Sequence, residues 1–278
     1  MTLNALLIFA IDMEIMGYIA SVFVGVSLGL IGGGGSILVV PILIYLFHID
    51  VVMATAYSLF VVGSSSTIGA FTNYRKGLVD IKTGVVFGLP AIASVYLTRK
   101  FLLPAFPEKI AQFGTFTLDK NLALLLLFAV VMIVAAAAMI KKPKVVTEEE
   151  EETEQVFNYP LILVEGVLVG GLTGLIGAGG GFIIIPALVL LSKLPMKKAV
   201  GTSLMIIAAK SLLGFLGDVS NYTIDWPFLL SIAGLAVVGI FIGIQLANYI
   251  PGKKLKPAFG WFVLVMGVYI ISKELFFK

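Results

Sequence analysis

Two glycine-rich segments are the part of this sequence most able to bind a ligand. Each interrupts an apolar stretch, of 33 residues from Ile15 to Phe47 and of 34 residues from Tyr159 to Ser192. Glycine disfavours helix, so each segment should expose backbone N–H groups and precede a new helix with a positive dipole end. Such groups bind anions, although small residues between apolar helices also allow close packing. The predicted anion-site lining is Gly32, Gly33, Gly34, Gly35 and Ser36, with Gly177, Gly179, Gly180 and Gly181.

Polar side chains inside the later apolar runs are the second candidate. Lys210 lies near the middle of the run Ala199–Gly217, where a cation is costly unless it faces a cavity or a partner. We predict that it binds the anion; the alternatives are an ammonium that reaches the membrane surface or a structural ion pair. Ser58, Thr202 and Ser203 add hydroxyls to the predicted site, although hydroxyls in helices also bond a carbonyl one turn back.

Other charged residues near or inside the apolar runs receive simpler interpretations. Three roles are open to Glu165: an ion pair with Lys210, a coupling proton site, or a place at the membrane interface, which we favour. Asp218 and Asn73 end their runs and are predicted to cap helices. The segment Arg99–Lys120 is predicted to be a loop outside the membrane.

The composition places the chain in a membrane. Of its 278 residues, 59% are hydrophobic and 13% are charged, against about 45–50% and about 25% in soluble domains. This excludes a soluble enzyme, a nucleic-acid-binding protein and a disordered chain. The chain has no cysteine and a single histidine, His48, so we predict no disulfide, metal site or cofactor. The N-terminus lacks the basic start of a signal peptide, and the first run is expected to remain in the protein.

Eight apolar runs organise the chain. They are Ile15–Phe47, Val51–Asn73, Leu78–Thr98, Asn121–Ile140, Tyr159–Ser192, Ala199–Gly217, Pro227–Ile250 and Leu255–Phe276. A shift of 145 residues aligns the two halves without a gap, and 17 of the 48 positions from Val22 to Gly69 are then identical. We therefore predict an all-α integral membrane protein with two homologous repeats, residues 1–140 and 159–278, joined by a charged linker, residues 141–158. Each repeat should open with a glycine-broken or re-entrant helix pair.

The basic residues favour an inverted arrangement of the two repeats. If both long runs turn back at their glycines, one membrane face carries 12 flanking lysines and arginines and the other carries 6; if both runs cross, the split is 10 against 8. The positive-inside rule favours the first arrangement, with the linker cytoplasmic and both termini outside. Inverted repeats with broken helices near the midplane are a recurrent plan in transporters.

The doubled glycine motif resembles the sulfite exporter TauE/SafE family. Its elements are Gly29–Ser36, Pro41, Ala54 and Ser58–Leu59 in the first half, and Gly174–Gly181, Pro186, Ala199 and Ser203–Leu204 in the second. The resemblance covers essentially the whole chain. It implies a transporter of sulfur-containing anions such as sulfite, sulfoacetate and other organosulfonates.

The leading hypothesis is a secondary transporter in the cell membrane that moves a small anion by alternating access around a midplane site. Its partners would be that anion and the lipid bilayer, without nucleic acid; the oligomeric state is open, and a homodimer is compatible with the sequence. An anion channel for small oxyanions is the alternative, because it would use the same glycine breaks. We expect no enzyme: an intramembrane serine protease needs a Ser–His pair, and His48 is the sole histidine.

Overall fold

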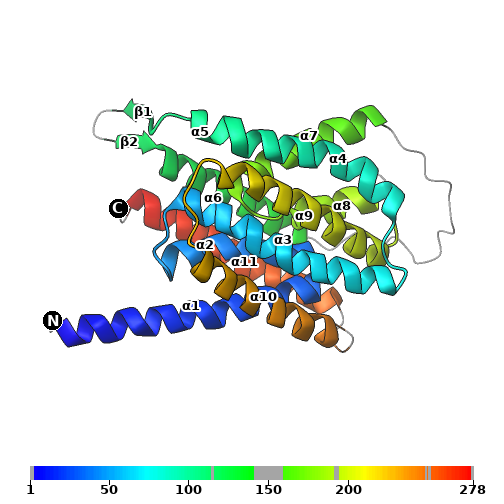
Figure 1. The fold of residues 1–278 in the computed structure, drawn as a ribbon, viewed down its shortest axis with the longest axis horizontal. Helices are drawn as coiled ribbons and strands as arrows, with labels where there is room; N and C mark the ends of the chain where they lie inside the picture. The colour runs from blue at the N-terminus through cyan, green and yellow to red at the C-terminus, as the bar shows by residue number, and fades with distance from the viewer. Residues whose placement is uncertain are drawn as a thin grey trace.

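Helices form most of the chain in the computed structural model, which describes residues 3–113, 116–140, 159–190, 194–247, 249 and 252–276 (Figure 1). The first half contains α1 (Leu3–Ile31), the 3₁₀ helix η1 (Gly33–Leu38), α2 (Val39–Tyr45), α3 (Val51–Arg75), α4 (Ile81–Leu97), the π-helical turn η2 (Thr98–Leu102), α5 (Leu103–Ala105), β1 (Lys109–Phe113), β2 (Phe116–Asp119) and α6 (Lys120–Ile140). The second half contains α7 (Tyr159–Ile176), α8 (Gly181–Leu190), α9 (Met196–Val219), α10 (Trp226–Leu246) and α11 (Gly252–Phe276). The predicted linker, residues 141–158, lies outside the described residues.

The helices have the length and surface of membrane spans. Within the described residues, six helices are long and apolar enough to cross a membrane. Large apolar side chains on them face outward; Phe23, Leu89 and Val134 are each more than 60% exposed. A water-facing surface would not carry so many such groups. The expectation of a helical multi-pass membrane protein is therefore confirmed.

A small β-hairpin is the one non-helical element within the described residues. The strands β1 and β2 pair antiparallel, with Lys109 opposite Asp119 and Gln112 opposite Thr117. They lie in the segment predicted to be a loop. Backbone groups there have no helix to satisfy them, so the two short stretches satisfy each other.

Both predicted breaks in the long apolar runs are confirmed. The helix α1 ends at Ile31 before η1 begins at Gly33, and α7 ends at Ile176 before α8 begins at Gly181. The φ angles are +75° at Gly32, +72° at Gly177 and +73° at Gly180. Only glycine adopts a positive φ without a steric penalty, so Gly32 and Gly177 end α1 and α7, and Gly180 directly precedes α8.

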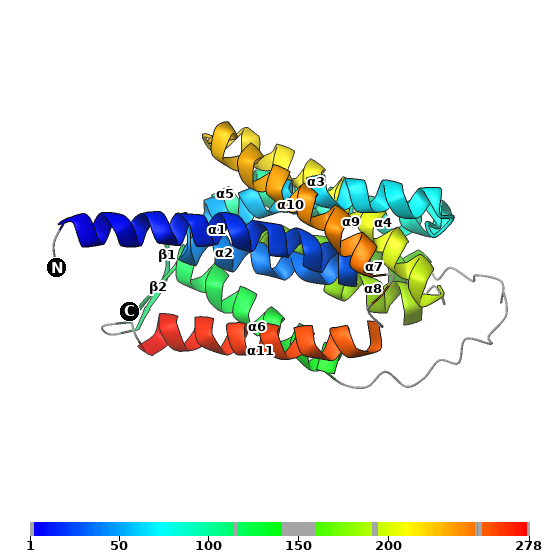
Figure 2. The ribbon, with the colours of Figure 1, turned by 90° about the horizontal axis from the view of Figure 1, so that it is seen from below.

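The chain reverses direction after the first break. Phe47, just beyond α2, packs its ring against Gly17 of α1 and lies 5.2 Å from the ring of Tyr18. The N- and C-terminal ends lie at one end of the bundle, whereas α6 ends and α7 begins toward the other (Figures 1 and 2). The α3–α4 connection also lies at that second end (Figure 1).

The two halves interlock through their helices. The most extensive contacts between halves join α1 to α10, α4 to α7, α3 to α9, α3 to α10, α4 to α9 and α6 to α11. Glycines bring several of these backbones together; Gly25 of α1 lies against Ala236 of α10, and Gly170 of α7 lies against Ala91 of α4. Without a hydrophobic force between helices in lipid, such close packing holds them together.

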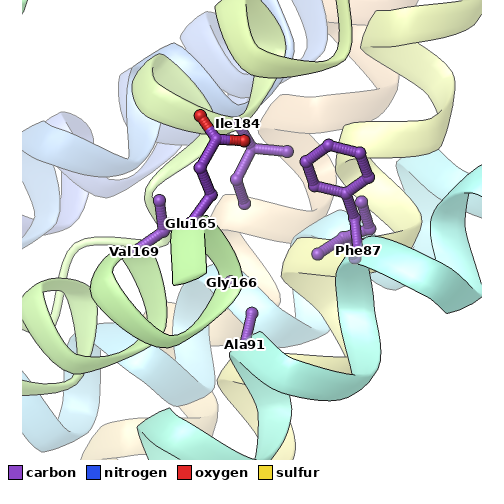
Figure 3. Close-up of a pocket in the computed structure, with 7 residues that line it drawn as sticks. Phe87, Ala91, Glu165, Gly166, Val169 and Ile184 are labelled. Carbon is purple, nitrogen blue, oxygen red and sulfur yellow. The ribbon is translucent and has the colours of Figure 1, made fainter. Parts of the chain in front are cut away.

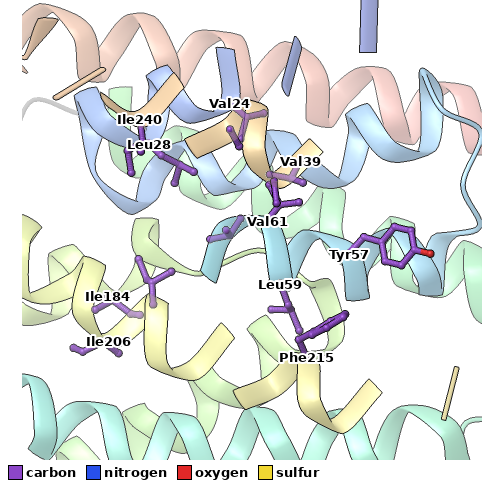
Figure 4. Close-up of a cluster of buried hydrophobic side chains, with 14 of the residues drawn as sticks. Val24, Leu28, Val39, Tyr57, Leu59, Val61, Ile184, Ile206, Phe215 and Ile240 are labelled. Carbon is purple, nitrogen blue, oxygen red and sulfur yellow. The ribbon is translucent and has the colours of Figure 1, made fainter. Parts of the chain in front are cut away.

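The central pair, α3 and α9, runs antiparallel. Gly69 contacts Leu204, Gly63 contacts Leu212, and Gly214 contacts Leu59. Higher residue numbers in α3 thus face lower residue numbers in α9, as in an antiparallel pair. A large cluster of buried side chains surrounds this pair, drawing on α1, α2, α8 and α10 as well (Figure 4). A second cluster lies between α6 and α11 and includes Phe128 and Val263.

Matching hydrogen bonds tie the halves together at the two ends of this pair. The Tyr57 hydroxyl of α3 accepts the Asp225 backbone N–H at 2.9 Å, and Thr202 Oγ1 of α9 accepts the Asp80 backbone N–H at 2.9 Å. Asp80 and Asp225 are the N-caps of α4 and α10, and their side chains accept the Thr83 and Phe228 backbone N–H groups. Each contact thus fixes the start of one helix against the other half.

Candidate functional site

The two glycine breaks meet inside the protein. A Cβ on Gly181 would overlap the Cα of Gly33, and a Cβ on Gly33 would lie 2.5 Å from the Cα of Gly181. A Cβ on Gly179 would lie 2.5 Å from Val62 Cγ1, and 3.0 Å and 3.1 Å from side-chain atoms of Ile207 and Ser36. Two main chains this close leave no space for side chains, so the glycines do have the packing role that was the alternative to an anion site. The same contact places the breaks from the two halves at one location.

The second break leaves backbone donors available. The N–H groups of Ala178, Gly179 and Gly180 donate to no backbone carbonyl in the described ranges, whereas Ile183 and Ile184 both donate to the Gly180 carbonyl at 3.0 Å. The helix α8 therefore starts directly after the break, with its positive dipole end there. This is the arrangement in which helix N-termini bind anions.

Lys210 lies beside this break. Its side chain is fully buried, and Nζ donates to Thr173 Oγ1 at 2.6 Å. Nζ would lie only 2.9 Å from a Cβ on Gly180. The ammonium therefore points at the glycines and does not reach the membrane surface, and no carboxylate of the described residues forms an ion pair with it.

The surroundings of Lys210 are positive on two sides. The ammonium and the N-terminal end of α8 adjoin each other at Gly180, and Thr173 offers only a neutral oxygen, because its own hydroxyl donates to the Val169 carbonyl at 2.7 Å. A buried cation without a counter-charge is costly. A small anion placed here would supply the missing charge.

The predicted hydroxyls differ in their hydrogen-bond partners. Ser58 is fully buried and its hydroxyl has no hydrogen-bond partner among the described residues. Ser36 donates to the Gly33 carbonyl at 2.7 Å and Ser203 to the Val200 carbonyl at 2.8 Å, bonds within their own helices. The Thr202 hydroxyl accepts the Asp80 backbone N–H at the end of the bundle.

Arg99 and Asp218 correct two expectations. Arg99 was expected in a loop, yet it lies in the π-helical turn η2 with no exposed surface, and Asp218 is equally buried. Arg99 Nη1 lies 3.4 Å from Asp218 Oδ2, so the Asp218 side chain is an ion-pair partner and not a helix cap. Asn73, the other predicted cap, does donate to the Gly69 carbonyl of its own helix at 2.8 Å.

The ion pair reaches the second glycine break through Thr55. Arg99 Nη1 donates to Thr55 Oγ1 at 3.0 Å, and Gly177 is packed against the Thr55 backbone and Cβ. Sequence reasoning missed this arrangement. The available signal was the apolar stretch Phe101-Leu102-Leu103 directly after Arg99 and Lys100, which extends the span past the charged pair.

Glu165 lies in a crevice among four helices. Phe87 and Ala91 of α4, Gly166 and Val169 of α7, Ile184 of α8 and Ile206 of α9 line it (Figure 3). Glu165 Oε2 is buried and has no hydrogen-bond partner among the described residues. Glu165 and Lys210 do not form an ion pair with each other.

The crevice lies about one helical turn from Lys210 and from its partner Thr173. Val169 precedes Thr173 by one turn of α7, and Ile206 precedes Lys210 by one turn of α9, about 6 Å along each axis. Beyond Lys210, Asp218 lies about 12 Å further along α9. Because α9 begins against the α3–α4 connection, with Gly201 on the Leu78 carbonyl, the crevice lies toward that end of the bundle and Asp218 toward the end that holds the termini.

No group of metal-ligating side chains accompanies this arrangement. Within the described residues, no three His, Asp or Glu side chains gather where they could hold a metal ion. The polar groups that do gather are two cations, one of which is paired with Asp218, together with free backbone N–H groups and hydroxyls. Lys210 and the N–H groups are suited to binding an anion.

Comparison with known proteins agrees with a membrane transport protein. A family model described as sulfite exporter TauE/SafE matches residues 18–270. The probable membrane transporter protein YdhB of Bacillus subtilis is 26% identical over 84% of this chain and 90% of its own length. The probable membrane transporter protein MJ0441 of Methanocaldococcus jannaschii is 29% identical over 92% and 93%, and one of Xylella fastidiosa is 26% identical over 90% and 92%. No solved structure matches the chain.

Proposed function

Because the chain belongs to the sulfite exporter TauE/SafE family, we propose that it is a secondary transporter of a small sulfur-containing anion. Sulfite, sulfoacetate and other organosulfonates are the candidate substrates. The protein is a multi-pass membrane protein of a transporter family. The substrate and the mechanism are the proposal.

The observation that carries the proposal is the position of Lys210. It is fully buried, it adjoins the N-terminal end of α8 at Gly180, and its one hydrogen bond among the described residues goes to the neutral hydroxyl of Thr173. A cation is retained inside a membrane protein, against its insertion cost, where it faces a pathway or a partner. A transported anion is the partner that this site lacks.

Two inverted repeats would give this site its symmetry. The equivalent helices α3 and α9 cross antiparallel, and Ser65 and Lys210, which are 145 residues apart, both lie close to the middle of that crossing. The two end contacts are likewise related, since Tyr57 and Asp225 correspond to Thr202 and Asp80 under the same shift. Both features support two homologous units in opposite orientations around a midplane site.

Alternating access would proceed by breaking one end contact at a time. Both hydrogen bonds, from Asp225 to Tyr57 and from Asp80 to Thr202, are formed in this structure. The Lys210 side chain is fully buried. We infer an occluded arrangement, in which opening either end would expose the site to one side. In this proposal the crevice at Glu165 would lie on the path toward the α3–α4 connection.

The charge distribution supports a cytoplasmic position for the α3–α4 end. With Arg99 and Lys120 buried, the flanking basic residues at the end of the termini fall from 6 to 4, against 12 at the other end. The positive-inside rule therefore favours the predicted orientation more strongly than the sequence alone did. A tag in the linker, residues 141–158, should be inaccessible from outside intact cells. Labelling of the tag from outside would show that the protein has the opposite orientation.

Reconstitution into liposomes tests the proposed function. Liposomes preloaded with sulfite or sulfoacetate should take up labelled substrate by saturable counterflow, because a transporter binds substrate on both sides. Electrical recordings from the same preparation should show no sustained anion conductance. Conductance without counterflow would favour the anion channel, and neither signal would reject both.

A further inference from the structure

Arg99 carries hydrogen-bonding capacity that the protein does not use. Its side chain has no exposed surface, and Nη1 alone serves both Thr55 and Asp218. Nε and Nη2 are buried and have no hydrogen-bond partner among the described residues. Buried guanidinium donors are normally satisfied, because leaving them unpaired is costly.

The two unused atoms lie on the same edge of the guanidinium plane. Nε–H and one Nη2–H point in parallel from this edge, the fork that receives two oxygens of a carboxylate, phosphate or similar oxyanion. The nearby acidic group, Asp218, is held at Nη1 instead. Arg99 is therefore held through Nη1, while the Nε–Nη2 edge has no hydrogen-bond partner among the described residues.

This edge belongs to the same region as Lys210. Arg99 bonds Thr55, which packs on Gly177, and Lys210 adjoins Gly180, three residues further along the same break. Asp218 lies two turns beyond Lys210 on α9. The guanidinium thus borders the second glycine break on the side of the termini, whereas the Glu165 crevice approaches from the opposite side.

We propose that the free edge of Arg99 is a second anion-binding subsite, which receives two oxygens of the transported oxyanion between Lys210 and the membrane face that holds the termini. The proposal rests on the proposed transport of an anion through Lys210. It adds Arg99 to the proposed anion site and predicts which anions the site prefers. The two parallel donors match sulfite and sulfonates, which offer paired oxygens, and do not match a monatomic halide. Asp218 positions the guanidinium and keeps Nη1 occupied.

Arg99→Lys tests the fork. Lysine retains the charge at this position but offers no planar pair of donors. With purified protein in nanodiscs, calorimetric titration should show affinity for sulfite and methanesulfonate falling by about 10-fold or more, the loss of one charge-assisted hydrogen bond, while chloride competes as before. Lys100→Met, at the neighbouring residue that bonds Tyr96, is the matched control and should bind as wild type.

A double variant separates binding from folding. Arg99→Met with Asp218→Leu replaces the buried ion pair by apolar side chains of similar size, a change that commonly preserves stability. Its thermal unfolding should stay near that of wild type while binding of sulfite and methanesulfonate is lost. A folded double variant that binds both anions as tightly as wild type would make Arg99 a structural residue and overturn the proposal.

Asp218→Asn gives a further readout if the double variant does not fold. Asparagine keeps the shape of the side chain and an oxygen beside Nη1, so the guanidinium stays in position, but it removes the negative charge that opposes binding of a second anion; sulfite should therefore bind more tightly. Weaker sulfite binding by the folded Asn variant would contradict the proposal. If wild-type protein itself binds none of these anions, the proposed function fails; if wild type binds and only the Arg99 variants behave as wild type, the subsite alone fails.

Discussion

Lys210→Met should make the protein inactive without destabilising it. Methionine has a similar length and replaces a fully buried ammonium by an apolar group. Removing a cation from the centre of a span recovers about 2.5–3.5 kcal/mol on insertion scales. The lost hydrogen bond to Thr173 costs about 1.5–3 kcal/mol, as for bonds to charged groups. Thr173 remains satisfied through its bond to Val169, so the free energy of unfolding should stay level or rise by up to about 2 kcal/mol.

Anion binding should change in the opposite direction. If the ammonium makes one charge-assisted hydrogen bond to the substrate, its loss removes about 1.5–3 kcal/mol, which is about 10- to 150-fold in affinity. Sulfite binding in nanodiscs, counterflow in liposomes and thermal unfolding would be measured on the same preparations. Lys197→Met removes the same charge from an exposed position on α9 and serves as the control, with binding and flux unchanged.

The combination of outcomes tests the reasoning about Lys210. A Met variant that is folded and binds sulfite as wild type does would remove Lys210 from the site. A variant that loses both folding and binding would show that the ammonium is needed for the structure. The inference that the ammonium binds the transported anion would then have no support.

Three further changes have defined expectations. Gly181→Ala should lower stability by about 1–3 kcal/mol or more and block counterflow, because its Cβ would overlap Gly33; Gly234→Ala, with open space around it, should be neutral or stabilising and keep wild-type flux. Glu165→Gln should flatten the pH dependence of uptake if this carboxyl carries a coupling proton, and an unchanged profile would return Glu165 to the interface role. Tyr57→Phe should speed substrate exchange at the end of the termini by removing the acceptor for Asp225, which rapid-mixing release from liposomes would detect; unchanged release would mean that this contact is no gate.

Features that depend on neighbouring residues were predictable. Apolar runs report burial in lipid over about 20 consecutive residues, so the spans and their approximate limits followed from hydropathy. The positive φ angles at Gly32 and Gly177 fall where glycine alone is tolerated, so both helix breaks were predicted at the correct place. Lys210 was found because one charge in an apolar run is visible without any structure.

Features that depend on distant residues were not predictable. Arg99 was expected in a loop because a lysine and two prolines follow it, and its partners Thr55 and Asp218 are far away in the chain. Thr202 reads as a site hydroxyl because it adjoins Ser203, yet it accepts the backbone N–H of Asp80. Neither pairing leaves a periodic or compositional trace.

The sequence by itself therefore determined the membrane class, the two helix breaks, the internal similarity and the candidate cation, since each arises from composition or local backbone preference. The tertiary structure alone decided that Gly33 and Gly181 touch, that Lys210 points at a glycine break and that the fork of Arg99 is left open. The reason is physical: a side chain buried among apolar helices takes its partner from whatever helix packs beside it, and helix packing in lipid is set by the fit of whole surfaces.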